Sequence, residues 1–318
     1  MDDILLQAEQ ISKAFQTKEG ALTALRDVNI CLRHGETLGI VGESGCGKTT
    51  LGRSLLRLHQ PDGGRIVFDG ETLFDHSWKK QPDMRPHRRK MQMIFQNPAA
   101  ALNPRKTAAQ SIAQALSIHK LVSSKAQEAD RVGELLSLVG LRAQDAAAYP
   151  HALSGGQQQR VVIARAMAVE PKLLVCDEPV SALDMSIQAQ IVALLKEMQK
   201  SRQLSCIFIS HDISVVRQLS HRIAVMYLGS IVEQAESSAL IEAPLHPYTR
   251  LLLDSVPSAD PRQKIQPPPG WDESPSPLAA TGGCPFYPRC PKRDSRCAQA
   301  SPALRERGSG HWVACHLA

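Results

Sequence analysis

The stretch Gly42-Glu43-Ser44-Gly45-Cys46-Gly47-Lys48-Thr49 fits the pattern G-x-x-x-x-G-K-[ST]. An apolar run, residues 37–41, precedes it, and a helical stretch from Lys48 to about Leu58 follows it. Glycines allow backbone N–H groups to converge on phosphate oxygens, and the start of a helix adds partial positive charge. The stretch therefore predicts a phosphate-binding loop between a strand and a helix.

Two side chains of this loop carry the expected chemistry. Lys48 should reach the β and γ phosphates of a nucleotide. Thr49 should place its hydroxyl on Mg²⁺, which prefers oxygen ligands and phosphates. Cys46 lies between two of the glycines, and its side chain is incidental to this role.

A second acidic segment follows an apolar run at residues 173–176, where Asp177 and Glu178 stand side by side. Neighbouring side chains on a strand point to opposite faces, so the two carboxylates do different jobs only if the strand ends before Glu178. Pro179 favours such an end. The pair then suits a metal-side Asp and an adjacent general base.

Length and composition are those of an ordinary globular protein. The 318 residues suffice for one large α/β domain with an appendage, and 43% are hydrophobic and 21% charged. The net charge of +6 is modest, and the basic run at residues 85–90 predicts a solvated face or a surface that meets acidic lipid or a partner. No run approaches the ~20 apolar residues that span a bilayer, and no signal peptide is expected at the start.

The remaining pattern outlines the architecture. Strands are expected at residues 65–68, 91–95, 173–176 and 206–210, and a hairpin at 222–232. Residues 97–169 predict a helical subdomain that interrupts the sheet. After about residue 250 the prolines indicate a linker or wrapping segment, including Pro257, Pro261, Pro267, Pro268, Pro269, Pro275 and Pro277.

Several motifs in order then resemble those of ABC ATPases. Leu153-Ser154-Gly155-Gly156-Gln157 resembles the family's signature motif, and Gln96 resembles the Q-loop glutamine. Ser181–Asp184 is similar to the D-loop, and His211 is similar to the H-loop histidine. The resemblance covers about residues 4–250. It implies an α/β P-loop NTPase cassette with a RecA-like core, an N-terminal antiparallel β subdomain and an inserted helical subdomain.

The resemblance assigns roles residue by residue. Asp177 supports the metal, Gln96 senses metal and water and is a Mg²⁺ ligand with Thr49, Glu178 activates the attacking water, and His211 contacts the γ-phosphate. The catalytic set implied is Glu178, His211 and Gln96. The nucleotide-binding set implied is Phe15, Gly42, Glu43, Ser44, Gly45, Cys46, Gly47, Lys48, Thr49, Thr50, Asp177, Ser154, Gly155, Gly156 and Gln157.

Two of these assignments need comment. Phe15 stands where the family has an aromatic residue that stacks on adenine, although a lone aromatic on a strand also suits the core. Residues 154–157 complete, in this family, the ATP site of a second cassette. The resemblance therefore implies two cassettes with two nucleotides between them, and a hydrolysing rather than a degenerate site.

The tail at residues 251–318 carries a narrower resemblance, to the C-terminal extension of oligopeptide, dipeptide and nickel importer ATPases. It starts at residues 246–249 (His-Pro-Tyr-Thr), and continues through 283–286 and 289–291 to His311 and residues 315–316. An irregular, cysteine-containing extension is the expectation. Dipeptides or short oligopeptides are the substrates this implies first, with nickel and glutathione as alternatives.

Eight cysteines fall into two sets, of which Cys31, Cys46, Cys176 and Cys206 are expected to be packed thiols. The tail set is Cys284, Cys290, Cys297 and Cys315. Five, six and seventeen residues separate its members, which is not a common zinc-finger spacing. Four thiolates suit a [4Fe–4S] cluster or tetrahedral Zn²⁺, and packed thiols are the third possibility.

Partners follow from the family. They are two transmembrane permease subunits, a second ATPase subunit that is a related heterodimer partner, and an extracytoplasmic substrate-binding protein. The chain itself is expected on the cytoplasmic side of the inner membrane as a peripheral subunit. A soluble ABC ATPase acting on nucleic acid is the competing hypothesis, but the chain lacks an aromatic-rich basic patch, a coiled coil and a second cassette.

Overall fold

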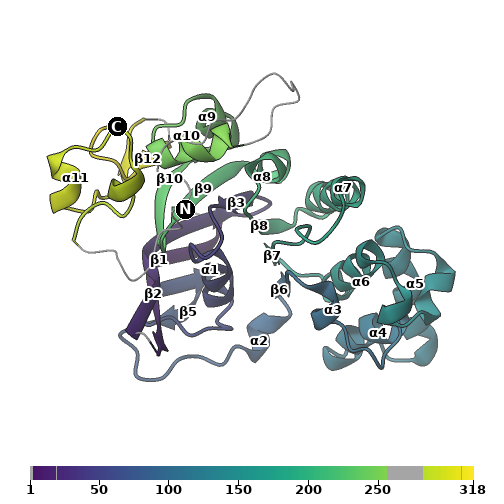
Figure 1. The fold of residues 1–318 in the computed structure, drawn as a ribbon. Coiled ribbons are helices and arrows are strands. Elements are labelled where there is room, and N and C mark those ends of the chain that lie inside the picture. Colours follow the sequence, from purple (N-terminus) through teal and green to yellow (C-terminus); the bar gives the residue numbers. More distant parts are fainter. Residues whose placement is uncertain (1–2, 19, 256–281, 309) are drawn as a thin grey trace, which may run out of the picture. The chain divides into compact units, whose positions relative to one another are not determined.

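The computed structural model describes residues 3–18, 20–255, 282–308 and 310–318 (Figure 1). The chain divides into two compact units. Unit 1 comprises residues 1–33, 37–82 and 209–318, and unit 2 comprises residues 34–36 and 83–208. The predicted proline-rich segment falls mostly on residues 256–281, which lie outside the described residues.

Unit 1 contains a four-stranded antiparallel sheet with the order β2-β1-β4-β5. Its strands are β1 (Ile4–Thr17), β2 (Gly20–Arg33), β4 (Gly63–Phe68) and β5 (Glu71–Asp75). Leu6 of β1 pairs with Phe68 of β4, and both side chains are fully buried. Strand β4 needs glycine at position 64, where φ is +95° and a Cβ would lie 2.3 Å from the Glu9 carbonyl oxygen.

A second group of strands in unit 1 holds the phosphate loop. β3 (Thr37–Val41) pairs in parallel with β9 (Arg222–Tyr227), which forms an antiparallel hairpin with β10 (Ser230–Glu236). This confirms the predicted hairpin. The helices of this unit are α1 (Lys48–Leu55), α8 (Ile213–Leu219), α9 (Ser237–Glu242) and α10 (Pro247–Asp254).

The described part of the extension, residues 282–308 and 310–318, is here called the cysteine lobe. It contains a 3₁₀ turn at Tyr287–Arg289, helix α11 (Ser295–Gln299) and the two-residue strands β11 (Arg305–Glu306) and β12 (Trp312–Val313). β12 adds to the edge of β10, because Val313 pairs with Glu233. The lobe is therefore less irregular than expected, since it extends a sheet of unit 1.

Unit 2 contains two parallel strands, β6 (Met91–Ile94) and β7 (Leu173–Asp177), and most of the buried strand β8 (Ser205–Ser210). Between β6 and β7, the described elements are all helical. They are α3 (Pro98–Ala101), α4 (Ala108–Ile118), α5 (Lys125–Leu138), α6 (Gly155–Met167) and the 3₁₀ turns Ala143–Ala147 and Pro150–Ala152. Helix α7 (Met185–Arg202) follows β7, and α2 (Arg85–Arg88) precedes β6.

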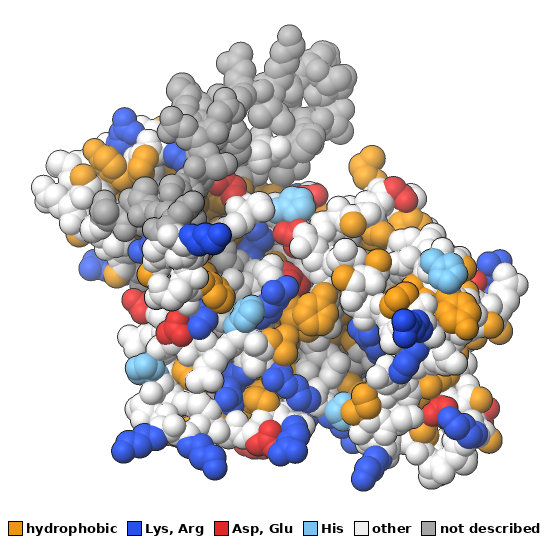
Figure 2. Space-filling view, turned by 60° about the horizontal axis from the view of Figure 1, so that its bottom comes forward, with side chains coloured by type: hydrophobic (Ala, Val, Ile, Leu, Met, Phe, Trp, Pro, Cys, Tyr) orange, Lys and Arg blue, Asp and Glu red, His pale blue; other side chains and the backbone are white. Residues whose placement is uncertain are grey.

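The helix starts in unit 2 have clear local causes. Thr107 and Ser154 each form a capping box, in which the side chain of the residue three positions later returns a hydrogen bond to the cap. Within the described residues, no helix is long and apolar enough to cross a membrane. Figure 2 shows Lys and Arg side chains at many separate places across the face in view.

Candidate nucleotide site

The phosphate loop of unit 1 connects β3 to α1, as the sequence predicts. Each of its glycines is required for a structural reason of its own. A Cβ on Gly42 would lie 2.1 Å from the Met226 carbonyl oxygen, and one on Gly47 would lie 2.4 Å from the Ala24 carbonyl oxygen. Gly45 has open space around it, but its φ of +79° favours glycine. Side chains are thus excluded where the loop packs against β2 and β9.

Lys48 begins helix α1 and is only 4% exposed. Its ammonium donates hydrogen bonds to the carbonyl oxygens of Gly42, at 2.7 Å, and Glu43, at 2.8 Å. The two loop carbonyls therefore stabilise the buried ammonium, which the partial positive charge of the helix N-terminus does not. Thr49 and Thr50 follow on the first turn and are half-buried, whereas Ser44 and Gly45 at the tip are exposed.

Cys46 is 4% exposed, and its Sγ lies 3.9 Å from the Lys48 ammonium. Burial raises the pKa of this thiol, and the charge of Lys48 opposes that shift without overcoming it. The thiol therefore stays protonated at neutral pH, which agrees with an incidental role.

In unit 2, strand β7 ends at Asp177, and Glu178 has a left-handed φ of +46°. A positive φ is uncommon for a residue with a Cβ and is found where a site constrains the backbone. Asp177 is 1% exposed, whereas Glu178 is half-buried. The strand ends where Pro179 predicted it to end. The two neighbouring carboxylates therefore need not point to opposite faces, as successive side chains of a strand do.

Gln96 and Glu178 come together within unit 2, although 82 positions separate them in sequence. The Gln96 Nε2 donates a hydrogen bond of 3.0 Å to Glu178 Oε2. Gln96 is exposed and lies two residues after the end of β6. The amide therefore orients the carboxylate that the sequence assigned as general base.

The segment Ser154–Gln157 caps helix α6. Ser154 Oγ accepts from the Gln157 N–H at 3.3 Å, and Gln157 Oε1 accepts from the Ser154 N–H at 3.0 Å. A Cβ on Gly156 would lie 2.5 Å from Ile187 Cγ2 of α7, so this position requires glycine for packing. Ser154 and Gly155 remain exposed. The segment thus presents polar groups at a helix start on the surface of unit 2.

The two other predicted residues lie in unit 1. His211 follows β8 and is exposed. Phe15 is half-buried on β1, with its ring centroid 5.6 Å from that of His59 in an edge-to-face contact and the Lys13 ammonium 5.4 Å from its centroid. This partial exposure distinguishes Phe15 from the fully buried aromatic residues of the core, such as Phe68.

The predicted residues are thus divided between the units. Phe15, the phosphate loop and His211 belong to unit 1, and Gln96, Asp177, Glu178 and residues 154–157 belong to unit 2. Sequence reasoning gave no role to Tyr248 or Arg289, which both contact Glu43 of the phosphate loop. Their contacts with Glu43 join residues far apart in sequence, so they become visible only in the structure.

The four tail cysteines share the cysteine lobe. Burial raises the pKa of the Cys284 thiol to about 11, and the neighbouring Cys297, Cys290 and Cys315 add to the shift. The thiols are therefore close enough for their charges to interact. Among the residues that the structure describes, however, no group of three or more His, Cys, Asp or Glu side chains is arranged to hold a metal ion. In this arrangement the four thiols do not form a ligand set.

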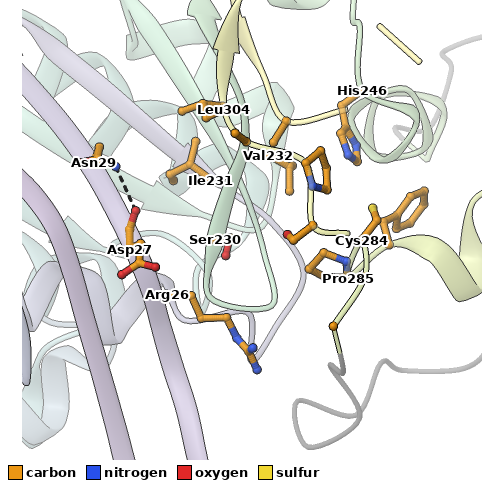
Figure 3. A pocket seen from close by; sticks show the side chains of 17 residues that line it. Arg26, Asp27, Asn29, Ser230, Ile231, Val232, His246, Cys284, Pro285 and Leu304 are labelled. Carbon is orange, nitrogen blue, oxygen red and sulfur yellow. Dashed lines mark hydrogen bonds between the residues drawn. The ribbon is translucent and has the colours of Figure 1, made fainter. Parts of the chain in front are cut away.

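A cavity of about 610 Å³ lies where the cysteine lobe meets the strands of unit 1 (Figure 3). Asp27 and Asn29 of β2 border it, as do Ile231 of β10, Leu304 and His246. Burial lowers the pKa of His246 to about 4, so its imidazole is neutral, and its Nδ1 accepts from the Tyr248 N–H at 3.1 Å. Arg26 is the one cationic side chain among the described residues that line the cavity, beside the carboxylate of Asp27.

Comparison with known proteins agrees with this architecture. Residues 25–181 match the family described as "ABC transporter", and residues 232–297 match "Oligopeptide/dipeptide transporter, C-terminal region". A dimeric ATP-binding cassette, MJ0796, in a post-hydrolysis state bound to ADP and Pi, is 28% identical with a TM-score of 0.66; the match covers 73% of this chain and 99% of that chain. The fold and site define an ABC-type ATPase cassette.

Two curated relatives come from Bacillus subtilis (strain 168). The oligopeptide transport ATP-binding protein OppF is 49% identical over 274 residues, which are 84% of this chain and 89% of OppF. The oligopeptide transport ATP-binding protein AppF is 45% identical over 308 residues, 96% of this chain and 93% of AppF. The chain belongs to the ABC transporter family, in the branch that carries the oligopeptide/dipeptide transporter C-terminal region. This confirms the predicted family and fold class.

Proposed function

We propose that this chain binds and hydrolyses Mg-ATP to drive uptake of dipeptides or short oligopeptides through membrane-spanning partner subunits. The phosphate loop carries the proposal, because Lys48 is buried at a helix N-terminus beneath a loop whose tip exposes Ser44 and Gly45. The peptide substrate is supported by the names of OppF and AppF and by the match at residues 232–297.

The residues of unit 1 bind the nucleotide. Lys48 exchanges its two carbonyl partners for phosphate oxygens, which are stronger acceptors because they are charged. Thr49 contributes its hydroxyl to Mg²⁺, and His211 contacts the γ-phosphate. Phe15 stacks on adenine, which its partial exposure permits. Mg²⁺ supplies charge neutralisation at the phosphates.

The residues of unit 2 hydrolyse the bound nucleotide. Glu178 takes a proton from the attacking water, and Gln96 holds the carboxylate in place through the 3.0 Å hydrogen bond. Asp177 supports the metal from the end of β7. A general base that is half-buried and already hydrogen-bonded needs little reorganisation before the reaction.

Residues 154–157 act on a second cassette. The exposed helix start at Ser154 and Gly155 suits binding of a phosphate that another subunit holds. We take that subunit to be a related, non-identical ATPase, and the other partners to be two permease subunits and an extracytoplasmic binding protein. The chain then works as a peripheral subunit on the cytoplasmic side of the inner membrane.

The cofactors are ATP and Mg²⁺. A [4Fe–4S] cluster, or Zn²⁺ in its place, stays a prediction that rests on the donor chemistry of Cys284, Cys290, Cys297 and Cys315. Its role in this proposal is structural, and no step of hydrolysis passes through it.

The test is an ATPase assay on the complex of the full chain with its permeases, reconstituted with the binding protein. Dipeptides and short oligopeptides should stimulate phosphate release, and nickel and glutathione should not. Stimulation by nickel or glutathione alone would overturn the peptide assignment and leave the ATPase assignment intact. Absence of ATP binding by the isolated full chain would overturn both.

A further inference from the structure

The cysteine lobe contacts the phosphate loop through one ion pair. Arg289 Nη1 and Nη2 donate to Glu43 Oε2 and Oε1, both at 2.9 Å, so the guanidinium and the carboxylate meet in a bidentate fork. The Arg289 side chain is 7% exposed and the Glu43 side chain 26% exposed. The pair joins positions 246 residues apart, and both belong to unit 1.

Glu43 is thereby held at three points. Its backbone N–H donates to Tyr248 Oη at 2.9 Å, its carbonyl oxygen accepts from Lys48 Nζ at 2.8 Å, and its carboxylate meets Arg289. The first turn of the phosphate loop is therefore fixed from helix α10, from the loop's own lysine and from the cysteine lobe. A loop that binds phosphates through backbone N–H groups depends on such a fixed backbone.

Aromatic side chains from β9, α10 and the lobe lie near the fork. The Arg289 guanidinium carbon lies 5.9 Å from the ring centroids of both Tyr227 and Phe286, and Phe286 packs against Tyr248 at 5.5 Å. Burial by itself lowers the Arg289 pKa, but the hydrogen bonds and charges of Glu43 and Tyr227 outweigh it, so the net shift is upwards. The guanidinium therefore stays charged and faces both Glu43 and Tyr227.

The negative charge of Glu43 means that this ion pair affects ATP binding. A carboxylate on a loop that binds a polyanion opposes binding by like-charge repulsion unless a cation compensates it. Lys48 is directed to the loop carbonyls, and Arg289 is bound to the carboxylate. Without Arg289 the loop would gain an uncompensated negative charge and lose one of its three fixed points.

We propose that Arg289 is a positioning residue for ATP binding, through which the C-terminal extension neutralises Glu43 and fixes the phosphate loop. This inference rests on the proposed function, and it gives the extension a direct part in the nucleotide site of the same chain. Arg289 acts through Glu43 and does not itself touch the nucleotide.

Binding of a fluorescent ATP analogue to the full chain, and ATPase kinetics of the transporter complex, test the inference with a double-mutant cycle. Arg289→Gln should weaken binding at least about tenfold, because it leaves the Glu43 charge unpaired. Glu43→Gln should weaken binding less, since it leaves a cation beside the phosphates. The double variant should bind ATP more tightly than Arg289→Gln alone, because it no longer leaves the Glu43 charge unpaired.

Further readouts separate positioning from folding. Arg289→Lys keeps the charge but loses the fork, so its affinity should fall between those of the wild type and Arg289→Gln. KM for ATP should rise in Arg289→Gln, while kcat at saturating ATP changes by less than about threefold. Arg305→Gln, a change at an exposed arginine of the same lobe, is the matched control and should leave the affinity unchanged.

Two outcomes would overturn the inference while leaving the proposed function standing. One is an unchanged ATP affinity in Arg289→Gln. The other is a double variant that binds as weakly as the sum of the single effects predicts, because additivity means that the two side chains do not act as a pair. A wild-type chain that fails to bind ATP would instead refute the proposed function itself.

Discussion

The phosphate loop and the cysteine lobe sit in the same unit but are organised differently. The loop draws its chemistry from eight consecutive residues, 42–49, whose glycines, lysine and threonine act where they stand in the sequence. The lobe is held by residues that are distant in sequence. Val313 pairs with Glu233 on β10, and Arg289 forms an ion pair with Glu43. A local motif can be recognised from one sequence. A contact between residues far apart in sequence can be recognised only once the fold is known.

Residues of the loop and of the lobe are also required for different reasons. Gly42 and Gly47 are required because backbone atoms lie too close for any side chain, and the requirement shows as a motif. Arg289 is required because another charge needs a partner, and nothing in its sequence neighbourhood shows that. We expect larger effects from changes in the motifs than from changes in the edge contacts.

The largest effect is expected for Glu178→Gln. Removal of a general base lowers turnover by about 10²–10⁴-fold, and ATP binding should persist because the phosphate loop is unchanged. Phosphate release and nucleotide binding, measured on the same preparation, separate the two. Glu134→Gln, with a side chain 62% exposed on α5, is the control. Normal hydrolysis by Glu178→Gln would remove this residue from its assigned role.

Lys48→Ala should weaken ATP binding by about a hundredfold or more. Loss of one partner from a buried, hydrogen-bonded charge pair typically costs about 2–5 kcal/mol. Equilibrium binding of ATP measures the change, with Lys125→Ala on α5 as a control whose side chain is 93% exposed. Undiminished affinity would refute the phosphate site.

These two predictions rest on what the sequence alone provides. Strand β3, helix α1 and the hairpin β9–β10 were predicted because their signals are local: an apolar run, a glycine loop and a turn at Gly229. The position of Glu178 beyond the end of β7 was predicted because Pro179 cannot continue a ladder. The roles of these residues came from their order along the chain, which matches the family.

The remainder could not be predicted for physical reasons. The hydrogen bond from Gln96 to Glu178 joins residues 82 positions apart, and sequence order gives roles but not distances. Strands β11 and β12 are two residues long, too short for any alternation pattern; β12 forms because β10 offers an edge, and β11 pairs with β12. Helix α10 continues to Asp254, beyond the predicted change near residue 250, because Pro247 suits its first turn and the next proline is Pro257.

On the extension side, the stability of the fold should fall as pH drops from about 6.5 to 4. The His246 pKa is lowered from 6.5 to about 4 by burial, so the unfolded chain binds more protons in this window. Stability is fully present above pH 6.5 and is lost as pH falls, by at most about 3 kcal/mol. Urea unfolding at several pH values measures it.

The matched variant is His246→Asn, because asparagine can still cap helix α10 but does not titrate in this range. Its unfolding free energy should depend less on pH between 6.5 and 4 than that of the wild type. Equal slopes for the two proteins would show that another group causes the acid sensitivity.

A smaller effect is expected in the signature segment. Gly156→Ala places a methyl group 2.5 Å from Ile187 Cγ2, and overpacking of this kind costs about 1–3 kcal/mol. Thermal unfolding should detect the loss. The control is Gly133→Ala on α5, where nothing lies within 4 Å and alanine should stabilise the helix by up to about 1 kcal/mol. A lowered stability in the control but not in Gly156→Ala would contradict the packing argument.

The smallest effect on the nucleotide site is expected for Cys297→Ser. Ligation by four cysteines predicts that this variant loses iron and sulfide, or zinc, relative to wild type purified anaerobically, while Lys48 continues to bind ATP. Metal analysis beside ATP binding measures both, and an unchanged metal content would contradict ligation. Because the lobe reaches the phosphate loop through Arg289, the ATP affinity should change by no more than it does in Arg289→Gln. A larger loss would mean that the lobe supports the loop through further contacts, such as Phe286 against Tyr248.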